Sequence, residues 1–325
     1  MTPAPVRVGV IGTGALGYHH VRLWRTIPGA TLVGFYERTP ARATEVSKQL
    51  ETTAFPSLEA LLDKVDAVSV VVSTSAHTEI GMAVLERGIH ALIEKPLADT
   101  VEGARRLVDA AERAGAVLQV GHVERFNRAV RAAAPYLDQP RFLQSERLAP
   151  FSPRGTDVAV ILDLMIHDLD LVLELVGAPA SEVRGTGVAV LTPHVDIANA
   201  RVEFANGAVA LITASRISRD RTRKLRIFQP TGYFSLDLAE GAGHFYRLKS
   251  GWQDLGAKKI EDIVEHVRLT APEAEPLKLE LESFLAAVRG EGEVVVSGAA
   301  GCEALALAFR VVEAIQASPL AATRP

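Results

Sequence analysis

The first 120 residues alternate between short apolar runs, often β-branched, and longer segments in which apolar positions recur every three or four residues. The first pattern is typical of buried β-strands and the second of amphipathic α-helices. The predicted strands are residues 6–11, 31–36, 67–72, 90–93 and 116–120, and the predicted helices are residues 15–26, 76–87 and 100–114. Strands and helices that alternate in this way predict an α/β fold with a doubly wound parallel sheet, as in a Rossmann domain.

A glycine-rich loop joins the first predicted strand to the first predicted helix. It reads Gly12-Thr13-Gly14-Ala15-Leu16-Gly17, which is the G-x-G-x-x-G pattern in its required position. The first glycine allows a tight turn, the second lets the backbone approach a pyrophosphate, and the third lets helix and sheet pack closely. Because a helix amino terminus also attracts anions, residues 12–17 are predicted to bind a dinucleotide.

Glu37, at the end of the second strand, supports this prediction and bears on the choice of cofactor. It lies about 20 residues beyond the last glycine, where a carboxylate accepts hydrogen bonds from the adenosine ribose. A carboxylate repels the 2′-phosphate of NADP, so the sequence favours NAD. The neighbouring Arg38 offers the alternative, because a guanidinium group can bind that phosphate.

The end of the third strand is also predicted to border the cofactor. Ser73, Thr74 and His77 follow the strand and are expected near the nicotinamide half of the cleft. Ser75 is equally well interpreted as a helix cap, and the two roles are compatible.

The strand over residues 90–93 leads into Glu94-Lys95-Pro96, where the proline prevents a regular continuation. In open α/β sheets, ligands bind beyond the carboxyl ends of the strands. Glu94 and Lys95 are therefore predicted to lie at the cofactor, with Lys95 as a catalytic residue. For an isolated Glu-Lys-Pro, the alternative is a surface ion pair before a turn.

After Gly121 the alternation stops, and a polar cluster containing His122, Arg125 and Asn127 follows. A second domain is predicted to begin here, so that residues 1–121 bind the dinucleotide and residues 122–325 form the rest. Its longest helix is expected to run from residue 157 or 158 to residue 176, ended by Gly177.

Asp163 and His167 lie four residues apart in this expected helix, and therefore on one face, where the carboxylate can orient the imidazole. The alternative is a satisfied core histidine with Asp168 and Asp170 in solvent. Burying Asp163 with His167 in an otherwise apolar helix costs free energy unless they pair or function. No third ligand stands at metal-binding spacing, so no metal site is predicted.

Composition limits the remaining classes of function. A chain of 325 residues with 48% hydrophobic content can form two cores. A formal net charge of −4 argues against nucleic-acid binding, and no apolar run is long enough to span a membrane. The single cysteine, Cys302, excludes an internal disulfide and suits a reducing cytoplasm, so a cytoplasmic enzyme with a small-molecule partner is expected.

Three motifs occur in order along the chain: the glycine-rich loop, Glu94-Lys95-Pro96, and Asp163 with His167. In this combination, with Gly121-His-Val-Glu-Arg-Phe-Asn127 and Pro276–Phe284, the chain resembles the Gfo/Idh/MocA family of oxidoreductases over nearly its whole length. The resemblance implies a carboxyl-terminal α/β domain with a large open, mainly antiparallel sheet that forms homodimers or homotetramers. It also implies that Lys95, Asp163 and His167 are catalytic and bind substrate, with His122, Arg125 and Asn127 on the substrate side.

Within the family, the chain resembles the branch of UDP-N-acetylglucosamine 3-dehydrogenases and related nucleotide-sugar dehydrogenases. The expected activity is thus NAD-dependent oxidation of a sugar hydroxyl. There are two alternatives. The protein could oxidise a free sugar or inositol-type polyol, or it could be a redox-neutral NAD-dependent glycoside hydrolase or lyase. Six cations between residues 216 and 226 are interpreted either as a diphosphate-binding cluster or as a solvated or intersubunit strand face.

Overall fold

The computed structural model describes residues 4–152, 155–156, 158–254 and 259–317. The described chain divides into two compact units. The first contains residues up to Val123 together with Ala274–Leu305, and the second contains Glu124–Glu273 together with residues from Ala306 onwards.

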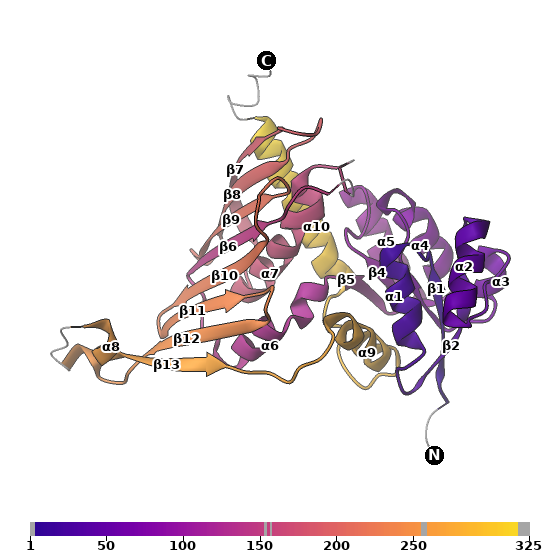
Figure 1. The fold of residues 1–325 in the computed structure, drawn as a ribbon, viewed down its shortest axis with the longest axis horizontal. Helices are drawn as coiled ribbons and strands as arrows, with labels where there is room; N and C mark the ends of the chain where they lie inside the picture. The colour runs from indigo at the N-terminus through magenta and orange to yellow at the C-terminus, as the bar shows by residue number, and fades with distance from the viewer. Residues whose placement is uncertain (1–3, 153–154, 157, 255–258, 318–325) are drawn as a thin grey trace. The chain divides into compact units, whose positions relative to one another are not determined.

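The first unit is built on a five-stranded sheet with the order β2-β1-β3-β4-β5, in which every neighbouring pair is parallel. This confirms the predicted Rossmann sheet (Figure 1). Its strands are β1 Val6–Ile11, β2 Ala30–Tyr36, β3 Ala67–Val70, β4 His90–Glu94 and β5 Leu118–Gly121. Its helices include α1 Ala15–Trp24, α2 Pro40–Leu50, α3 Leu58–Leu62, α4 His77–Leu85, α5 Val101–Ala114 and α9 Pro276–Val288.

Local signals account for the ends of these elements. The Thr100 side chain accepts a hydrogen bond from the N–H of Gly103 and caps α5, which ends at Gly115 with a φ of +62°. A left-handed residue at this position ends a helix, and glycine adopts it without a steric penalty. The predicted limits of α5 and of most strands therefore agree with the structure to within about two residues, the usual uncertainty of such limits.

Helix α9 packs into the first unit, although all residues after 121 were expected in the second domain. Its Leu281 and Phe284 are fully buried in the same core cluster as Trp24 of α1. The Trp24 and Phe284 rings meet edge to face with centroids 6.4 Å apart. Burial of large apolar side chains, which the sequence pattern does not assign to a particular partner, places this helix.

The second unit is built on an eight-stranded sheet with the order β13-β12-β11-β10-β6-β9-β8-β7. Its pairs are antiparallel except for β6 with β9, which confirms the predicted large, mainly antiparallel sheet. The strands are β6 Phe142–Leu148, β7 Ala180–Val188, β8 Ile197–Phe204, β9 Val209–Ser215, β10 Thr222–Gln229, β11 Gly232–Asp237, β12 Ala242–Leu248 and β13 Val264–Leu269. The helices are α6 Arg128–Ala133, a π-helix Ile161–Met165, α7 Ile166–Val176, α8 Ile260–Ile263 and α10 Gly298–Gln316, whose first part belongs to the first unit.

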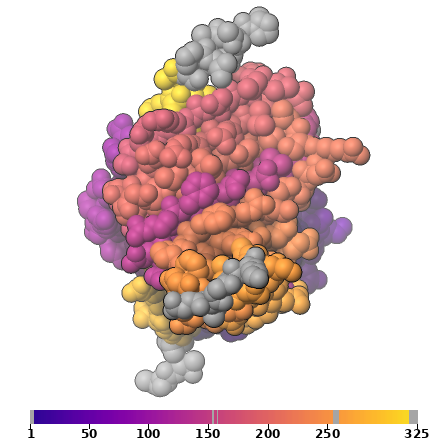
Figure 2. All heavy atoms as spheres, turned by 90° about the vertical axis from the view of Figure 1, so that its left-hand side faces the viewer, coloured from indigo at the N-terminus to yellow at the C-terminus, as the bar shows by residue number. Residues whose placement is uncertain are grey.

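Helices α6 and α7 lie on one face of this sheet, here called the inner face, and burial alternates along its strands (Figure 1). Figure 2 views the opposite, outer face, on which β6 in magenta lies open between its neighbours. No helix within the described ranges is long and apolar enough to cross a membrane.

Candidate functional site

The glycine-rich loop has the geometry that its sequence indicates. Gly12 has a φ of +86°, and a side chain there would collide with the carbonyl of Val71. A side chain at Gly17 would collide with the carbonyl of Gly12, whereas a Cβ at Gly14 would meet no atom within 4 Å. The loop is thus closed at its two ends and open at the glycine expected to face a pyrophosphate.

Helix α1 begins directly after this opening. Gly14 is its N-cap, no side chain caps it, and its first turn, with Ala15 and the exposed Leu16, contains no acidic residue. The N–H groups of the first turn therefore remain available to an anion, which fits a dinucleotide pyrophosphate.

Glu37 lies against the same loop. One carboxylate oxygen accepts hydrogen bonds from the N–H of Thr13 at 2.8 Å and from its hydroxyl at 3.2 Å, and the other accepts from the N–H of Thr39 at 2.9 Å. Burial raises the pKa of Glu37, but these hydrogen bonds outweigh burial and bring the pKa below its usual value. Glu37 is therefore a fixed negative charge beside the loop, and the neighbouring Arg38 is exposed.

Glu94 is a buried support for the backbone of Lys95. One carboxylate oxygen lies 3.2 Å from Nε2 of His20, and the other accepts a hydrogen bond from the N–H of Lys95 at 3.2 Å. Gly121 faces Glu94 across the β4–β5 pair, and a Cβ there would lie 2.7 Å from the carboxyl carbon. The side chain of Glu94 is only 7% exposed, and its contacts with His20 and Lys95 are internal to the unit.

His77, the first residue of α4, joins two strand ends. Its Nδ1 lies 2.8 Å from the carbonyl oxygen of Pro96, and its Nε2 lies 3.2 Å from that of Val72. Burial lowers the pKa of His77, and the two carbonyls only partly offset this effect. The histidine therefore fixes the segment after Lys95 to the end of the third strand.

Ser73 and Thr74 lie at the turn after β3, where the Ser73 hydroxyl is 3.4 Å from that of Ser75. The predicted helix cap at Ser75 is wrong. A 3₁₀ turn over Thr74–Ala76 precedes α4, so Ala76 takes the N-cap position and no side chain caps the helix.

The sequence predicted that Asp163 and His167 share one regular α-helix, and this prediction is wrong. Asp163 lies in the π-helix Ile161–Met165, closed by a hydrogen bond from the N–H of Ile166 to the carbonyl of Ile161, and His167 lies in the first turn of α7. The expected start at residue 157 falls outside the described residues, and the helical segment begins close to Ile161 instead. A π-helical turn often occurs at functional sites.

The loop before the π-helix closes on Asp163. Gly155 has a φ of +71°, and a Cβ there would lie 2.7 Å from one Asp163 carboxylate oxygen. Buried Arg216 donates hydrogen bonds to the carbonyls of Gly155 and Val158, so it holds this loop in place.

Two family models match the chain. The family model described as "Oxidoreductase family, NAD-binding Rossmann fold" matches residues 6–122, and the one described as "Oxidoreductase family, C-terminal alpha/beta domain" matches residues 152–320. The chain belongs to the Gfo/Idh/MocA oxidoreductase family. The resemblance inferred from the three motifs is confirmed, and the first unit of this Gfo/Idh/MocA protein contains an NAD-binding Rossmann domain.

Several relatives resemble the chain over most of its length. The UDP-N-acetylglucosamine 3-dehydrogenase of Acidithiobacillus ferrooxidans is 41% identical over 96% of this chain and 98% of its own. A solved structure of that enzyme has a TM-score of 0.89 and covers 97% of this chain and 99% of its own at 38% identity. The myo-inositol 2-dehydrogenase of Thermotoga maritima is 25% identical over 96% of both chains.

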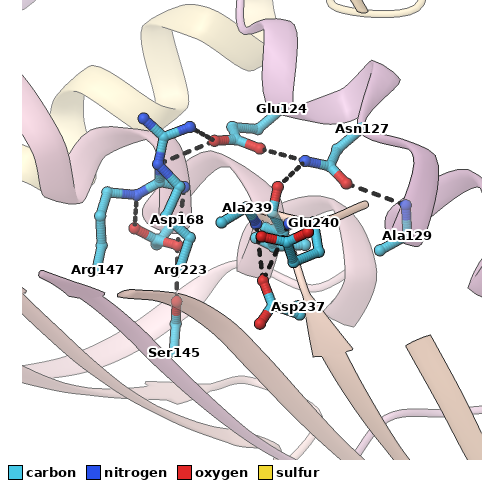
Figure 3. A network of polar contacts seen from close by, with 11 residues as sticks. Glu124, Asn127, Ala129, Ser145, Arg147, Asp168, Arg223, Asp237, Ala239 and Glu240 are labelled. Carbon is cyan, nitrogen blue, oxygen red and sulfur yellow. Dashed lines mark hydrogen bonds and ion pairs between the residues drawn. The ribbon is translucent and has the colours of Figure 1, made fainter. Parts of the chain in front are cut away.

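Sequence reasoning missed a buried charge cluster in the second unit of this Gfo/Idh/MocA oxidoreductase (Figure 3). Arg147 donates to both oxygens of Asp168, at 2.6 and 3.3 Å, and to Glu124 at 2.8 Å. The Ser145 hydroxyl donates to Asp168 at 2.7 Å. Asp168 is 1% exposed, so the reading that leaves it in solvent is wrong.

Arg125 and Asp170 form a second buried pair. The guanidinium donates to the two carboxylate oxygens at 2.6 and 2.8 Å, and it also contacts Glu174. Asp170 is 1% exposed, so the interpretation that places it in solvent is also wrong. Asn127 donates to Glu124 and to the carbonyl of Leu238 and caps α6, so both substrate-side candidates hold protein groups here.

The two pairs join α7, which contains His167, to strand β6 through Arg147 and to the 3₁₀ turn that contains Arg125. His122, the remaining candidate, is fully buried in the first unit. The strand pattern offered one signal: Leu143, Ser145 and Arg147 alternate on the buried face of β6, where an arginine needs a carboxylate partner. Throughout the described ranges, no group of three or more His, Cys, Asp or Glu residues is arranged to hold a metal ion.

The basic run is divided among three environments. Arg216 is buried and supports the loop before Asp163, while Arg223 faces the inner side of the sheet and contacts Glu124 at 3.5 Å. Lys224 and Arg226 are exposed on the outer face. The run is therefore neither a single cluster nor a single solvated face.

Proposed function

We propose that the protein is an NAD-dependent dehydrogenase that oxidises the 3-hydroxyl of UDP-N-acetylglucosamine. The observation that carries the proposal is the 41% identity to the Acidithiobacillus enzyme over 96% of the chain, which extends through both compact units. The inositol dehydrogenases are more distant. One is 25% identical over 96% of the chain, and another is 31% identical but covers only 66% of it. Because specificity resides in the site and not in the fold, similarity throughout the second unit favours the nucleotide sugar.

We assign cofactor binding to residues 1–121, and substrate contacts and subunit association to residues 122–325. The family models support this division, since one matches residues 6–122 and the other matches residues 152–320. Helix α9 contributes to the core of the first unit.

NAD is the proposed cofactor in preference to NADP. Glu37 is held beside the glycine-rich loop by Thr13 and Thr39, and its lowered pKa keeps it ionised at neutral pH. A fixed carboxylate accepts hydrogen bonds from ribose hydroxyls and repels a 2′-phosphate. Exposed Arg38 is the residue that would favour NADP if Glu37 were removed.

The chemistry requires a hydride acceptor, which NAD supplies when bound, and groups that remove a proton and stabilise an alkoxide. His167 is the proposed base, because an imidazole with an ordinary pKa near 6.5 accepts a proton at neutral pH. Asp163 is proposed to orient it. The Lys95 ammonium stabilises the developing alkoxide by its charge, or acts as the base if its surroundings lower its pKa.

The test combines purified protein, NAD and UDP-N-acetylglucosamine with a ketone-trapping reagent, and follows reduced-nicotinamide absorbance and product mass. We expect NADH and a product two hydrogens lighter, with NADP a poorer acceptor. Lys95→Ala should lower kcat by about 10²–10⁴-fold, the usual effect of removing a general acid–base group, and should keep NAD binding. Lys64→Ala, at an exposed lysine of the same unit, is the matched control.

Other outcomes would redirect the proposal. Turnover of inositols without turnover of nucleotide sugars would favour a polyol dehydrogenase, and a changed sugar without net NADH would indicate redox-neutral chemistry. Wild-type activity of folded Lys95→Ala would remove that lysine from the mechanism.

We also propose that the protein forms a homo-oligomer through the outer face of the second sheet. Neighbouring strands place a continuous row of rings there, with successive centroids 5.8, 5.3, 4.8 and 4.9 Å apart. The row is formed by Phe142, Phe228, Tyr233, Tyr246 and His266. Glu146 and Lys224 face each other on the same surface, so the face carries both signs of charge and can pair with a second copy of itself.

A further inference from the structure

Arg223 lies directly opposite Arg147 across the β10–β6 pair, on the inner face of the second sheet. Leu225 and Ile227 follow it on this face and are buried, whereas Lys224 and Arg226 lie on the outer face. Like charges that face each other in an antiparallel pair destabilise the sheet unless other groups compensate them.

The compensation is unequal between the two arginines (Figure 3). Arg147 holds Asp168 at 2.6 Å and Glu124 at 2.8 Å. Arg223 contacts the same Glu124 oxygen at 3.5 Å, the limit of a hydrogen bond, and the other Glu124 oxygen accepts from Asn127. Arg147 thus takes the closest contacts of both carboxylates, and Arg223 has one long shared contact in the cluster.

Exposure separates the two side chains further. The Arg147 side chain is 3% exposed and that of Arg223 is 40% exposed. Burial and the nearby Arg147 lower the pKa of Arg223, and Arg221 lowers it further. The surroundings of Arg223 therefore disfavour its positive charge, and a bound anion would relieve this effect.

Arg221 adds a second guanidinium at the same end of the strand. It is exposed and lies directly before β10, two residues ahead of Arg223. The positive charge of Arg221 contributes to lowering the pKa of Arg223.

We propose that Arg223, together with Arg221, binds the diphosphate group of the nucleotide-sugar substrate, a proposal that rests on the function proposed above. Planar guanidinium groups bind phosphate oxygens in a bidentate manner and discriminate strongly for such anions. Arg147 holds both Glu124 and Asp168, which limits repulsion of an incoming anion. Asp168 directly follows His167 in α7, so the same contacts connect the anion site to the helix of the proposed base.

The test compares Arg223→Gln and Arg221→Gln with Lys64→Gln, which removes one positive charge from an exposed lysine of the first unit. Calorimetry measures binding of UDP and of inorganic pyrophosphate, and steady-state kinetics measure KM and kcat for UDP-N-acetylglucosamine. We expect Arg223→Gln to raise the Kd of UDP and the KM roughly 10- to 100-fold, the usual effect of losing a charge-assisted contact. We expect kcat and NAD binding to change less than about threefold, because this loss concerns uniform binding of the substrate.

Arg223→Lys separates charge from shape, because it keeps the charge and loses the planar fork; it should give an intermediate Kd, and it also carries the test if the glutamine variant fails to fold. Unchanged UDP binding in folded Arg223 variants, with wild-type oxidation of UDP-N-acetylglucosamine intact, would overturn the diphosphate site and leave the proposed function standing. Pyrophosphate or UDP binding that depends on Arg223 without any oxidation would do the reverse. If wild-type protein bound none of these anions, the site would be rejected.

Discussion

At the scale of single residues, Glu94 was expected at the cofactor, but its carboxylate holds the backbone of the catalytic candidate Lys95. Its carboxylate touches His20 and the N–H of Lys95, and only a glycine at position 121 leaves room for it. A buried carboxylate with these partners fixes the backbone from which the lysine side chain extends.

Gly121→Ala tests this role. The added Cβ would lie 2.7 to 2.8 Å from the carboxyl atoms of Glu94, so the carboxylate must move. We expect a loss of roughly 1–3 kcal/mol in the free energy of unfolding, as for other overpacked sites. We expect kcat to fall about 10- to 100-fold, because small misplacements of reacting groups are costly.

Gly292→Ala is the control, since its Cβ would meet only Ala286 at an ordinary 3.6 Å. Chemical denaturation and steady-state kinetics on both variants give the answer. A Gly121→Ala enzyme that loses stability and keeps its kcat would show that Glu94 does not position Lys95.

At the scale of elements, His77 connects the end of β3, through Val72, to the segment after β4, through Pro96. Burial lowers its pKa in the folded protein, whereas an unfolded histidine titrates near 6.5. Between these two values the unfolded chain binds more protons than the folded chain. The contribution of His77 to stability is therefore complete above about pH 6.5 and is lost as the pH falls below it.

We predict that the thermal midpoint of the wild-type protein decreases as the pH is lowered from 7.5 to 5.5. His77→Gln should make this decrease smaller. Burial also lowers the pKa of His90, so this histidine accounts for part of the pH dependence that remains. His194→Gln removes an exposed imidazole and should leave the profile unchanged. Parallel pH profiles for wild type and His77→Gln would refute the assignment.

The same scale shows what the sequence can predict. The strands and helices of the first unit follow local patterns, so β1, α1 and α5 could be located from apolar spacing, the glycine-rich loop and caps. The π-helix could not, because it depends on an i→i+5 closure with no local signal of its own. Nor could the partners of Asp168, since Arg147 comes from a strand 21 residues earlier and only the packing of α7 against β6 brings it near.

At the scale of the whole molecule, the outer face of the second sheet joins rings from five strands into one surface. Phe228 is 37% exposed on this face. A hollow of about 600 Å³ on the same face is lined by Tyr233, Tyr246, Ile260 and Val264. Large apolar patches with mixed charge at a sheet face are typical of subunit interfaces. A self-complementary face favours a twofold arrangement of identical subunits.

The double change Tyr233→Ser and Tyr246→Ser removes the centre of the ring row, and we predict that it converts the oligomer to monomers at micromolar concentration. Loss of two buried aromatic rings per subunit, each of which contributes twice in a twofold interface, should raise the dissociation constant at least about 100-fold. Tyr136→Ser is the control, because Tyr136 is exposed but contacts Phe245, whose side chain is buried away from the ring row. Light scattering coupled to size exclusion measures the mass over a dilution series; a wild-type protein that is monomeric throughout the series, or a double variant with the wild-type mass, would contradict the proposed interface.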